Sequence, residues 1–379
     1  MEIRNLLEAM VRNGASDLYL LVDNPPLLRV EGINQRVGES LLAPADTEAI
    51  ALDLMNEAET QQFRASKEMN LGVSVDGVGR FRVNVLQQRG SVGLVIRHIK
   101  TVIPTLDEMH LPPILKDIVM TKRGLILVTG ATGSGKSTTL AAMIGHRNEH
   151  SRGHIITVED PVEFVHPNRN CCVTQREVGS DTASFGAALK NTLRQAPDVI
   201  LIGEIRDLET MEAAITFAET GHLCLGTLHS SNANQTLQRV MNFFPAERHA
   251  EIYLQLSLNL RAVLSQRLVP GVAGRRVAAI EILLDTPWVK ELVRKGEVDT
   301  IKEAMERGAP EGCQTFDEAL LSLYSEGRIE MKAALENADS SNNLRIKLTQ
   351  VDTKRGVQAA PSAEPTTFRI GGSGASAAA

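Results

Sequence analysis

The sequence predicts an α/β fold with two domains, the larger of which contains a parallel sheet. The chain has 379 residues, which is more than one ordinary domain needs. Hydrophobic residues make up 43% and charged residues 23%, as is typical of globular proteins with a sizeable core. From about residue 124 onward, strand-like and helix-like segments alternate. This alternation is typical of parallel strands joined by helical crossovers.

The first predicted domain covers residues 1–100. It begins with a helix, because apolar residues recur at helical spacing before Gly14: Ile3, Leu6, Leu7, Met10 and Val11. Short runs rich in branched residues follow and predict strands, namely LYLLV, LLRVEG, GVSVDG, RFRVNVLQQ and VGLVIRHI. A small α/β domain is therefore expected.

A linker is predicted at residues 101–113, where TVIPTLDEMHLPP holds three prolines and no regular periodicity. The second domain is predicted at residues 114–350. Its last strand, RVAAIEILL, precedes four or five short helices, including PWVKELVRKG, IKEAMERG, FDEALLSLYSEG and IEMKAALENA. Residues 351–379 have few large apolar side chains and predict a flexible tail.

Composition excludes several classes of protein. The net charge of -6 and the aromatic content of 3% disfavour a nucleic-acid partner, because such proteins usually carry basic surfaces and aromatic stacking platforms. None of the four cysteines forms the C-x-x-C spacing of a structural zinc site. The N-terminus lacks the apolar core of a signal peptide, and no run of about 18 apolar residues occurs. A cytoplasmic protein with at most peripheral membrane association is expected.

The segment GATGSGKST is the strongest motif, since it follows the apolar run GLILVT and precedes a helical pattern. In such a loop, successive backbone amides face a phosphate and the helix N-terminus adds its dipole. Lys136 is expected to reach the terminal phosphates of ATP, and the hydroxyl of Ser137 to ligate Mg²⁺. The predicted nucleotide-binding residues here are Gly130, Ala131, Thr132, Gly133, Ser134, Gly135, Lys136, Ser137 and Thr138.

The segment ITVEDPVE places three carboxylates after a predicted strand: Glu159, Asp160 and Glu163. Ligands of open α/β sheets bind at the carboxyl ends of strands, and a carboxylate there can activate the water that attacks a γ-phosphate. Glu163 is the favoured base. For Glu159 and Asp160, a catalytic role and a solvated acidic loop both stay open.

The segment VILIGEIRD is a predicted apolar strand that ends at Glu204. This is the arrangement of a Walker B segment, although Gly203 stands where many proteins with such a segment have aspartate. Glu204 is expected to organise Mg²⁺ or its water shell. The alternative for Glu204 is a helix cap or a salt-bridge partner.

Two histidines, His222 and His229, flank the predicted strand LCLGTL. On one extended strand they point to opposite faces and are too far apart to share a metal. His229, at the carboxyl end, is expected to sense the γ-phosphate, whereas the role of His222 stays open.

Four segments together resemble the secretion and pilus ATPases of the type II/type IV class: GATGSGKS, ITVEDPVEF, LRQAPDVILIGEIRD and TGHLCLGTLHS. Within that class, residues 1–345 are most similar to the pilus-retraction ATPases of the PilT/PilU family. The paired-cysteine zinc insertion of the extension ATPases is absent from the sequence.

The resemblance implies a PAS-like N-terminal domain joined to a RecA-like P-loop ATPase domain with a small helical appendage. It also implies six copies in a ring, with ATP between the domains and Arg82 and Arg97 completing the phosphate site. Three departures favour the PilU side of the family: Ala131 replaces a proline, Tyr19 replaces a histidine, and PWVKELVRK stands in place of AIRNLIRE.

The implied function is that of a homohexameric ATP-hydrolysing motor at the cytoplasmic, inner-membrane base of a type IV pilus. Such a motor promotes pilus retraction and twitching motility. Its implied partners are further copies of itself, an inner-membrane platform protein and a paralogous retraction ATPase. The alternative is an ATP-binding regulatory or accessory partner of such a paralogous motor.

Overall fold

The computed structural model describes residues 2–30, 32–99, 102–272 and 274–354. These residues form two compact units, the first within Met1–Leu268 and Ile280–Thr315, the second within Val269–Ala279 and Phe316–Ala379. Most of the predicted tail and Thr101 of the predicted linker lie outside the described residues. The domain boundaries expected at residues 100 and 350 stay predictions.

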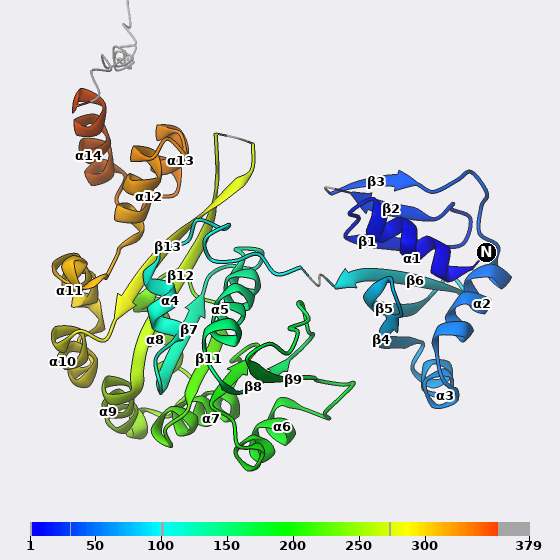
Figure 1. The fold of residues 1–379 in the computed structure, drawn as a ribbon, viewed down its shortest axis with the longest axis horizontal. Helices are drawn as coiled ribbons and strands as arrows, with labels where there is room; N and C mark the ends of the chain where they lie inside the picture. The colour runs from blue at the N-terminus through cyan, green and yellow to red at the C-terminus, as the bar shows by residue number, and fades with distance from the viewer. Residues whose placement is uncertain (1, 31, 100–101, 273, 355–379) are drawn as a thin grey trace, which may run out of the picture. The chain divides into compact units, whose positions relative to one another are not determined.

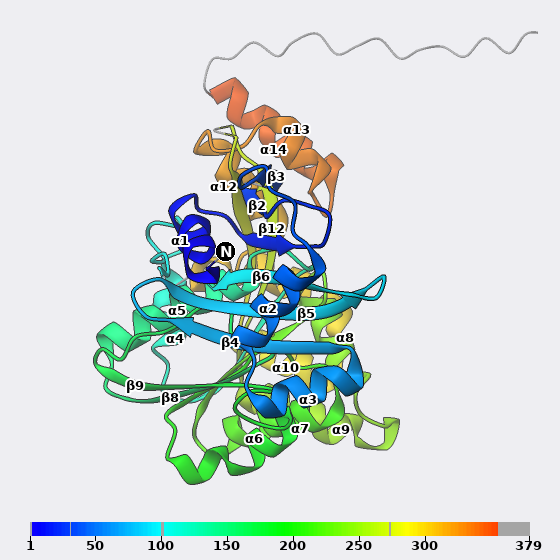
Figure 2. The ribbon, with the colours of Figure 1, turned by 90° about the vertical axis from the view of Figure 1, so that its right-hand side faces the viewer.

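The N-terminal part of the first unit contains a six-stranded antiparallel sheet. Its strand order is β3-β2-β1-β6-β5-β4, and Figure 2 shows β4, β5 and β6 side by side. Alternate residues of β5, such as Phe81, Val83 and Val85, are buried in a core of their own, as expected of a sheet with one covered face. The elements are α1 (Ile3–Arg12), β1 (Asp17–Leu20), β2 (Leu27–Val30), β3 (Ile33–Arg36), α2 (Pro44–Leu54), α3 (Glu57–Ser66), β4 (Glu68–Val75), β5 (Gly79–Gln88) and β6 (Ser91–Ile99).

A seven-stranded sheet of order β13-β12-β7-β11-β10-β8-β9 forms the larger part of the first unit (Figure 1). The strands from β12 to β9 in this order pair in parallel, which confirms the predicted parallel sheet. Its strands are β7 (Gly124–Thr129), β8 (Gly153–Glu159), β9 (Cys171–Glu177), β10 (Val199–Ile202), β11 (Leu223–Leu228), β12 (Leu260–Pro270) and β13 (Arg276–Leu284).

Both faces of this sheet are covered, because every residue of β7, β10 and β11 is buried. Leu125 and Leu127 join a core with α6, α7 and α8, whereas Ile126 and Val128, which alternate with them, point to the other face. Burying each such side chain contributes about 1.5–3 kcal/mol. The helices are α4 (Ile114–Val119), α5 (Lys136–His150), α6 (Phe185–Thr192), α7 (Leu208–Glu219), α8 (Ala233–Met241), α9 (His249–Asn259), α10 (Pro287–Lys295) and α11 (Ile301–Arg307).

The second unit contains three helices that pack on one another, α12 (Phe316–Ser325), α13 (Met331–Glu336) and α14 (Ser341–Lys354). Phe316, Leu320, Leu344 and Leu348 form its core. Helix α14 extends to Lys354, so the first residues of the predicted tail are helical. Among the described residues, no helix is both long and apolar enough to cross a bilayer.

Candidate active site

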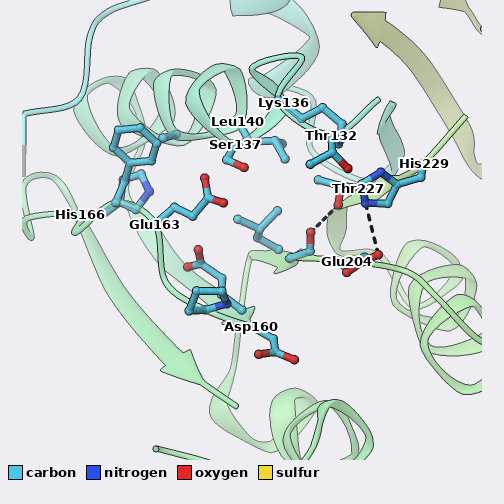
Figure 3. A pocket seen from close by; sticks show the side chains of 17 residues that line it. Thr132, Lys136, Ser137, Leu140, Asp160, Glu163, His166, Glu204, Thr227 and His229 are labelled. Atoms are coloured by element: carbon cyan, nitrogen blue, oxygen red, sulfur yellow. Dashed lines mark hydrogen bonds and ion pairs between the residues drawn. The ribbon is translucent and has the colours of Figure 1, made fainter. Parts of the chain in front are cut away.

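One pocket lies where the parallel strands of the seven-stranded sheet end. The loop after β7 contributes Thr132 and Gly133, and α5 contributes Lys136 and Ser137. Figure 3 shows these side chains around one hollow with side chains from three further loops. The loop after β8 contributes Glu159, Asp160, Glu163 and His166, the segment after β10 contributes Gly203 and Glu204, and Thr227 and His229 come from the end of β11.

The loop between β7 and α5 has the geometry that its glycines predict. Gly130, Gly133 and Gly135 have φ angles of 148°, 76° and 88°, a region that side chains other than glycine rarely adopt. A Cβ on Gly130 would also lie 2.5 Å from the carbonyl oxygen of Gln266. Helix α5 begins at once, at Lys136, so its unpaired amides face the pocket mouth.

Lys136 is buried at the base of this loop. Its Nζ donates hydrogen bonds to the carbonyl oxygens of Gly130, at 2.8 Å, and Ala131, at 3.0 Å. Burial lowers the pKa of Lys136, and the nearby charges of Glu204 and Glu163 oppose that shift. The ammonium group is therefore held against the backbone of the loop, within the electrostatic influence of Glu204 and Glu163.

The four carboxylates of the pocket differ in their partners. Glu159 accepts from Thr157 Oγ1 at 2.6 Å, Asp160 pairs with Arg206 at 3.3 Å, and Glu204 pairs with His229 Nε2 at 3.3 Å. Within the described part of the chain, Glu163 is the one whose carboxylate has no hydrogen-bond or ion-pair partner. Glu163 alone among them keeps both oxygens available to a substrate or a water.

Gly203 and Glu159 pack against each other across β10 and β8. A Cβ on Gly203 would lie 3.0 Å from Glu159 Cα and 3.1 Å from the carbonyl oxygen of Val158. Such contacts are tighter than those that side chains normally make, and both partners are backbone atoms or close to them. An aspartate at position 203 would therefore require the backbone near Glu159 to shift by a few tenths of an ångström, a close fit that glycine avoids.

The donor set suits Mg²⁺ bound together with phosphates. The described residues contain no cluster of three or more histidine, cysteine or acidic side chains placed to hold a metal by themselves. Mg²⁺ typically takes only one or two protein oxygens and completes its shell with phosphate and water. Ser137 and Glu204 line the pocket with such oxygens, and the buried hydroxyl of Ser134, in the loop before α5, has no hydrogen-bond partner within the described part of the chain.

Several residues of the site escaped sequence analysis. Gln266, in β12, donates to the carbonyl oxygen of Ser134 at 2.9 Å and accepts from Thr139 Oγ1 at 2.7 Å, so it braces the loop before α5. His166 lines the pocket with 8% of its surface exposed, and burial lowers its pKa to about 4. Gln266 lies 132 residues from Ser134, so no local pattern could have indicated the contact.

Eight residues singled out in the sequence do not line this pocket. Five of them belong to the loop before α5 or to the start of α5, namely Gly130, Ala131, Ser134, Gly135 and Thr138, and the other three are Arg82, Arg97 and His222. Arg82 and Arg97 are register partners on β5 and β6, and Arg97 Nε pairs with Asp17 Oδ1 at 2.9 Å. His222 precedes β11, and its Nδ1 lies 3.0 Å from Thr220 Oγ1. It therefore lies at the opposite end of the strand from His229.

A family model described as Type II/IV secretion system protein matches residues 2–362. The chain is 53% identical over 349 residues to the type IV pilus ATPase PilU of Pseudomonas aeruginosa, covering 92% of this chain and 91% of PilU. It is 43% identical over 343 residues to the type IV pilus retraction ATPase PilT of the same organism, covering 90% of this chain and 100% of PilT.

A crystal structure of the pilus retraction motor PilT with bound ADP is similar in fold, with a TM-score of 0.86 and 39% identity. The similarity covers 91% of this chain and 99% of that structure. The likeness therefore extends over both sheets and not only over the loop before α5.

Proposed function

The chain is an ATPase of the Type II/IV secretion system protein family, in its PilT/PilU branch, and on this premise we propose that it is a homohexameric motor of a type IV pilus, promoting pilus retraction. The observation that carries the catalytic part is the carboxylate of Glu163, which lies in the pocket with Lys136 and Ser137 and has no hydrogen-bond or ion-pair partner among the described residues. The motor part is supported by the similarity of the chain to PilU, a type IV pilus ATPase, and to PilT, a type IV pilus retraction ATPase.

In the proposed reaction, water attacks the γ-phosphate and ATP becomes ADP and phosphate. The amides of the loop before α5 and the ammonium of Lys136 stabilise the negative charge of the phosphates. Glu163 accepts the proton of the attacking water. Ser137 and Glu204 would hold Mg²⁺, which neutralises phosphate charge in a pocket that otherwise contains four carboxylates.

His229 is proposed as the group that responds to the γ-phosphate. His229 follows directly after β11, and its Nε2 lies 3.3 Å from Glu204 Oε1. A bound Mg²⁺ and phosphate that interact with Glu204 would compete with His229 for its carboxylate. Release of the phosphate would therefore let His229 contact Glu204 again. Arg82 and Arg97 are proposed to approach the phosphates from the N-terminal domain.

The proposed setting is the cytoplasmic face of the inner membrane at the pilus base. The proposed partners are five further copies, an inner-membrane platform protein and a paralogous retraction ATPase. These proposals are based on the similarity of the chain to the type IV pilus ATPases PilU and PilT.

Replacing Glu163 tests the catalytic assignment. Glu163→Gln keeps the volume but cannot accept a proton, so kcat should fall about 10²- to 10⁴-fold while ATP binding is retained. Lys136→Ala should lose both ATP affinity and turnover. Steady-state phosphate release and calorimetry with a slowly hydrolysed ATP analogue measure the two quantities.

Asp160→Asn is the matched comparison, because Asp160 belongs to the same loop but already pairs with Arg206. Its loss of kcat should be less than about tenfold, below the range expected for a lost base. A Glu163→Gln enzyme that hydrolyses ATP at the wild-type rate would contradict the assignment.

A second candidate function is that of an accessory partner of a paralogous motor ring. Higher identity to PilU than to PilT and the PWVKELVRK sequence of α10 favour it. A wild-type protein that binds ATP, hydrolyses none alone, and increases the turnover of the paralogous ring would select this candidate.

A further inference from the structure

The loop that carries Glu163 is held by an edge strand that sequence analysis did not identify. This loop follows β8, and β9 pairs with β8 as the last strand of the sheet. Gln175 and Glu177 are two residues apart on β9, so their side chains point to the same face. Both make hydrogen bonds with the loop, at positions on either side of Glu163.

Gln175 makes three of these hydrogen bonds with one carboxamide. Its Nε2 donates to Glu159 Oε1 at 3.1 Å and to the carbonyl oxygen of Phe164 at 2.8 Å. Its Oε1 accepts from the backbone amide of His166 at 2.8 Å. Both amide hydrogens and the oxygen are used, so only a glutamine fits this arrangement.

Glu159 extends the contact to the backbone of Glu163 itself. The Glu159 carboxylate accepts from Thr157 and from Gln175, and the backbone amide of Glu163 adds a further hydrogen bond. Glu177 Oε2 accepts from the amide of Val162 at 3.0 Å. The backbone on both sides of Glu163 is thereby fixed while its carboxylate stays free.

We infer that Gln175 is a positioning residue for the base, which acts by fixing the backbone of the Glu163 loop through Glu159, Phe164 and His166. This inference rests on the proposed role of Glu163. A displacement of about 1 Å in a catalytic group can reduce turnover about 100-fold. Lys136 and Ser137 come from α5 and not from this loop, so we expect a change at Gln175 to reduce turnover more than affinity.

Gln175→Glu tests the inference with almost no change in volume. The new carboxylate cannot donate a hydrogen bond. It therefore places a third acceptor next to Glu159 Oε1 and the carbonyl oxygen of Phe164, and both hydrogen bonds are lost. We expect kcat to fall at least tenfold, with KM and the Kd for Mg²⁺-ATP within about twofold of wild type. Gln175→Met, which keeps the length and removes every hydrogen bond, should show the same pattern.

The exchange Glu159→Gln with Gln175→Glu provides a rescue. The carboxamide at position 159 then donates to the carboxylate at position 175, so kcat should recover relative to Gln175→Glu alone. Cys172→Ser is the control, since Cys172 is exposed on β9 and its side chain points away from the Gln175 face. It should behave as wild type.

The outcomes separate the inference from the function on which it rests. A wild-type protein without ATP hydrolysis rejects the proposed function. A wild type that hydrolyses ATP, with Gln175→Glu and Gln175→Met at the same kcat, rejects only the inference. Equal losses of affinity and kcat without rescue, or failure of both single variants to fold, show a general structural role for Gln175 and also reject it.

Discussion

His166 is the residue whose protonation the fold opposes most clearly. Burial lowers its pKa from 6.5 to about 4. The unfolded chain therefore takes up a proton near pH 6.5, whereas the folded protein does so only near pH 4. The stability that depends on neutral His166 is present above pH 6.5 and is lost as the pH falls toward 4. The difference between these two pKa values corresponds to about 3 kcal/mol of the free energy of unfolding.

The change His166→Gln should remove this acid sensitivity. Between pH 7 and pH 4.5, the wild-type free energy of unfolding should fall by about 2.5 kcal/mol more than that of the variant. Urea unfolding at the two pH values measures it. The same change at His150, which is exposed at the end of α5, serves as control. Parallel losses in wild type and His166→Gln would contradict the prediction.

At the level of single residues, local motifs predicted which side chains meet in the pocket but not what holds them. Lys136, Ser137, Glu163, Glu204 and His229 line it, because each follows or ends a parallel strand. The braces, Gln266 and Gln175, come from strands elsewhere in the sequence and carry no motif. Three of their five hydrogen bonds are made with backbone groups, which leave no pattern of residue types in the sequence.

Helix α7 begins directly after the Glu204 segment and depends on its N-cap. Asp207 Oδ1 accepts from the amide of Thr210 at 2.9 Å. This hydrogen bond, together with one from the Thr210 side chain, lowers the pKa of Asp207 below 3.8. The cap therefore stabilises the helix at neutral pH and is lost only as the pH falls through that lowered pKa.

Asp207→Ala should destabilise the protein by about 1 kcal/mol at pH 7, since it removes the acceptor for an unpaired helix amide. Asp207→Asn keeps an acceptor and should cost only a fraction of that. Thermal or urea unfolding of both variants measures the difference. If alanine and asparagine have equal effects, the side-chain cap does not stabilise α7.

Most elements with strong periodicity or apolar runs were predicted, although β12, an apolar and mostly buried strand, and helices α4 and α9 were not identified. Weakly patterned elements were missed. The strands of the parallel sheet before α5 and α7 and the short helices after β13 were identified. Strand β9 was missed because CCVTQRE mixes polar residues on both faces, as suits an edge strand whose side chains bind a loop. Strand β3, which is fully exposed, and helices α2 and α3 were missed for want of a clear apolar stripe.

On the scale of the whole molecule, the second unit has a hydrophobic core separate from that of the first. Leu320 is fully buried there among residues of α12 and α14. Leu320→Ala should destabilise this unit by about 2–5 kcal/mol through the cavity it leaves. Hydrogen exchange should rise in α12, α13 and α14, while calorimetric ATP affinity is unchanged.

Ile346→Ala is the matched control, because Ile346 lies on α14 with 61% of its surface exposed. Its effect should stay within about 0.5 kcal/mol. Faster exchange in β7 and α5 of Leu320→Ala would show instead that the two units unfold together.

The contact between Gly203 and Glu159 restricts how the sequence of this protein can evolve. A mutation that introduces aspartate at position 203 meets the main chain of the neighbouring strand, 3.0 Å from its Cα atom. Such a substitution would require the main chain of β8 to shift by a few tenths of an ångström. Whether aspartate is accepted at position 203 therefore depends on how readily β8 can move, and an earlier change that loosens β8 would make it easier to accept.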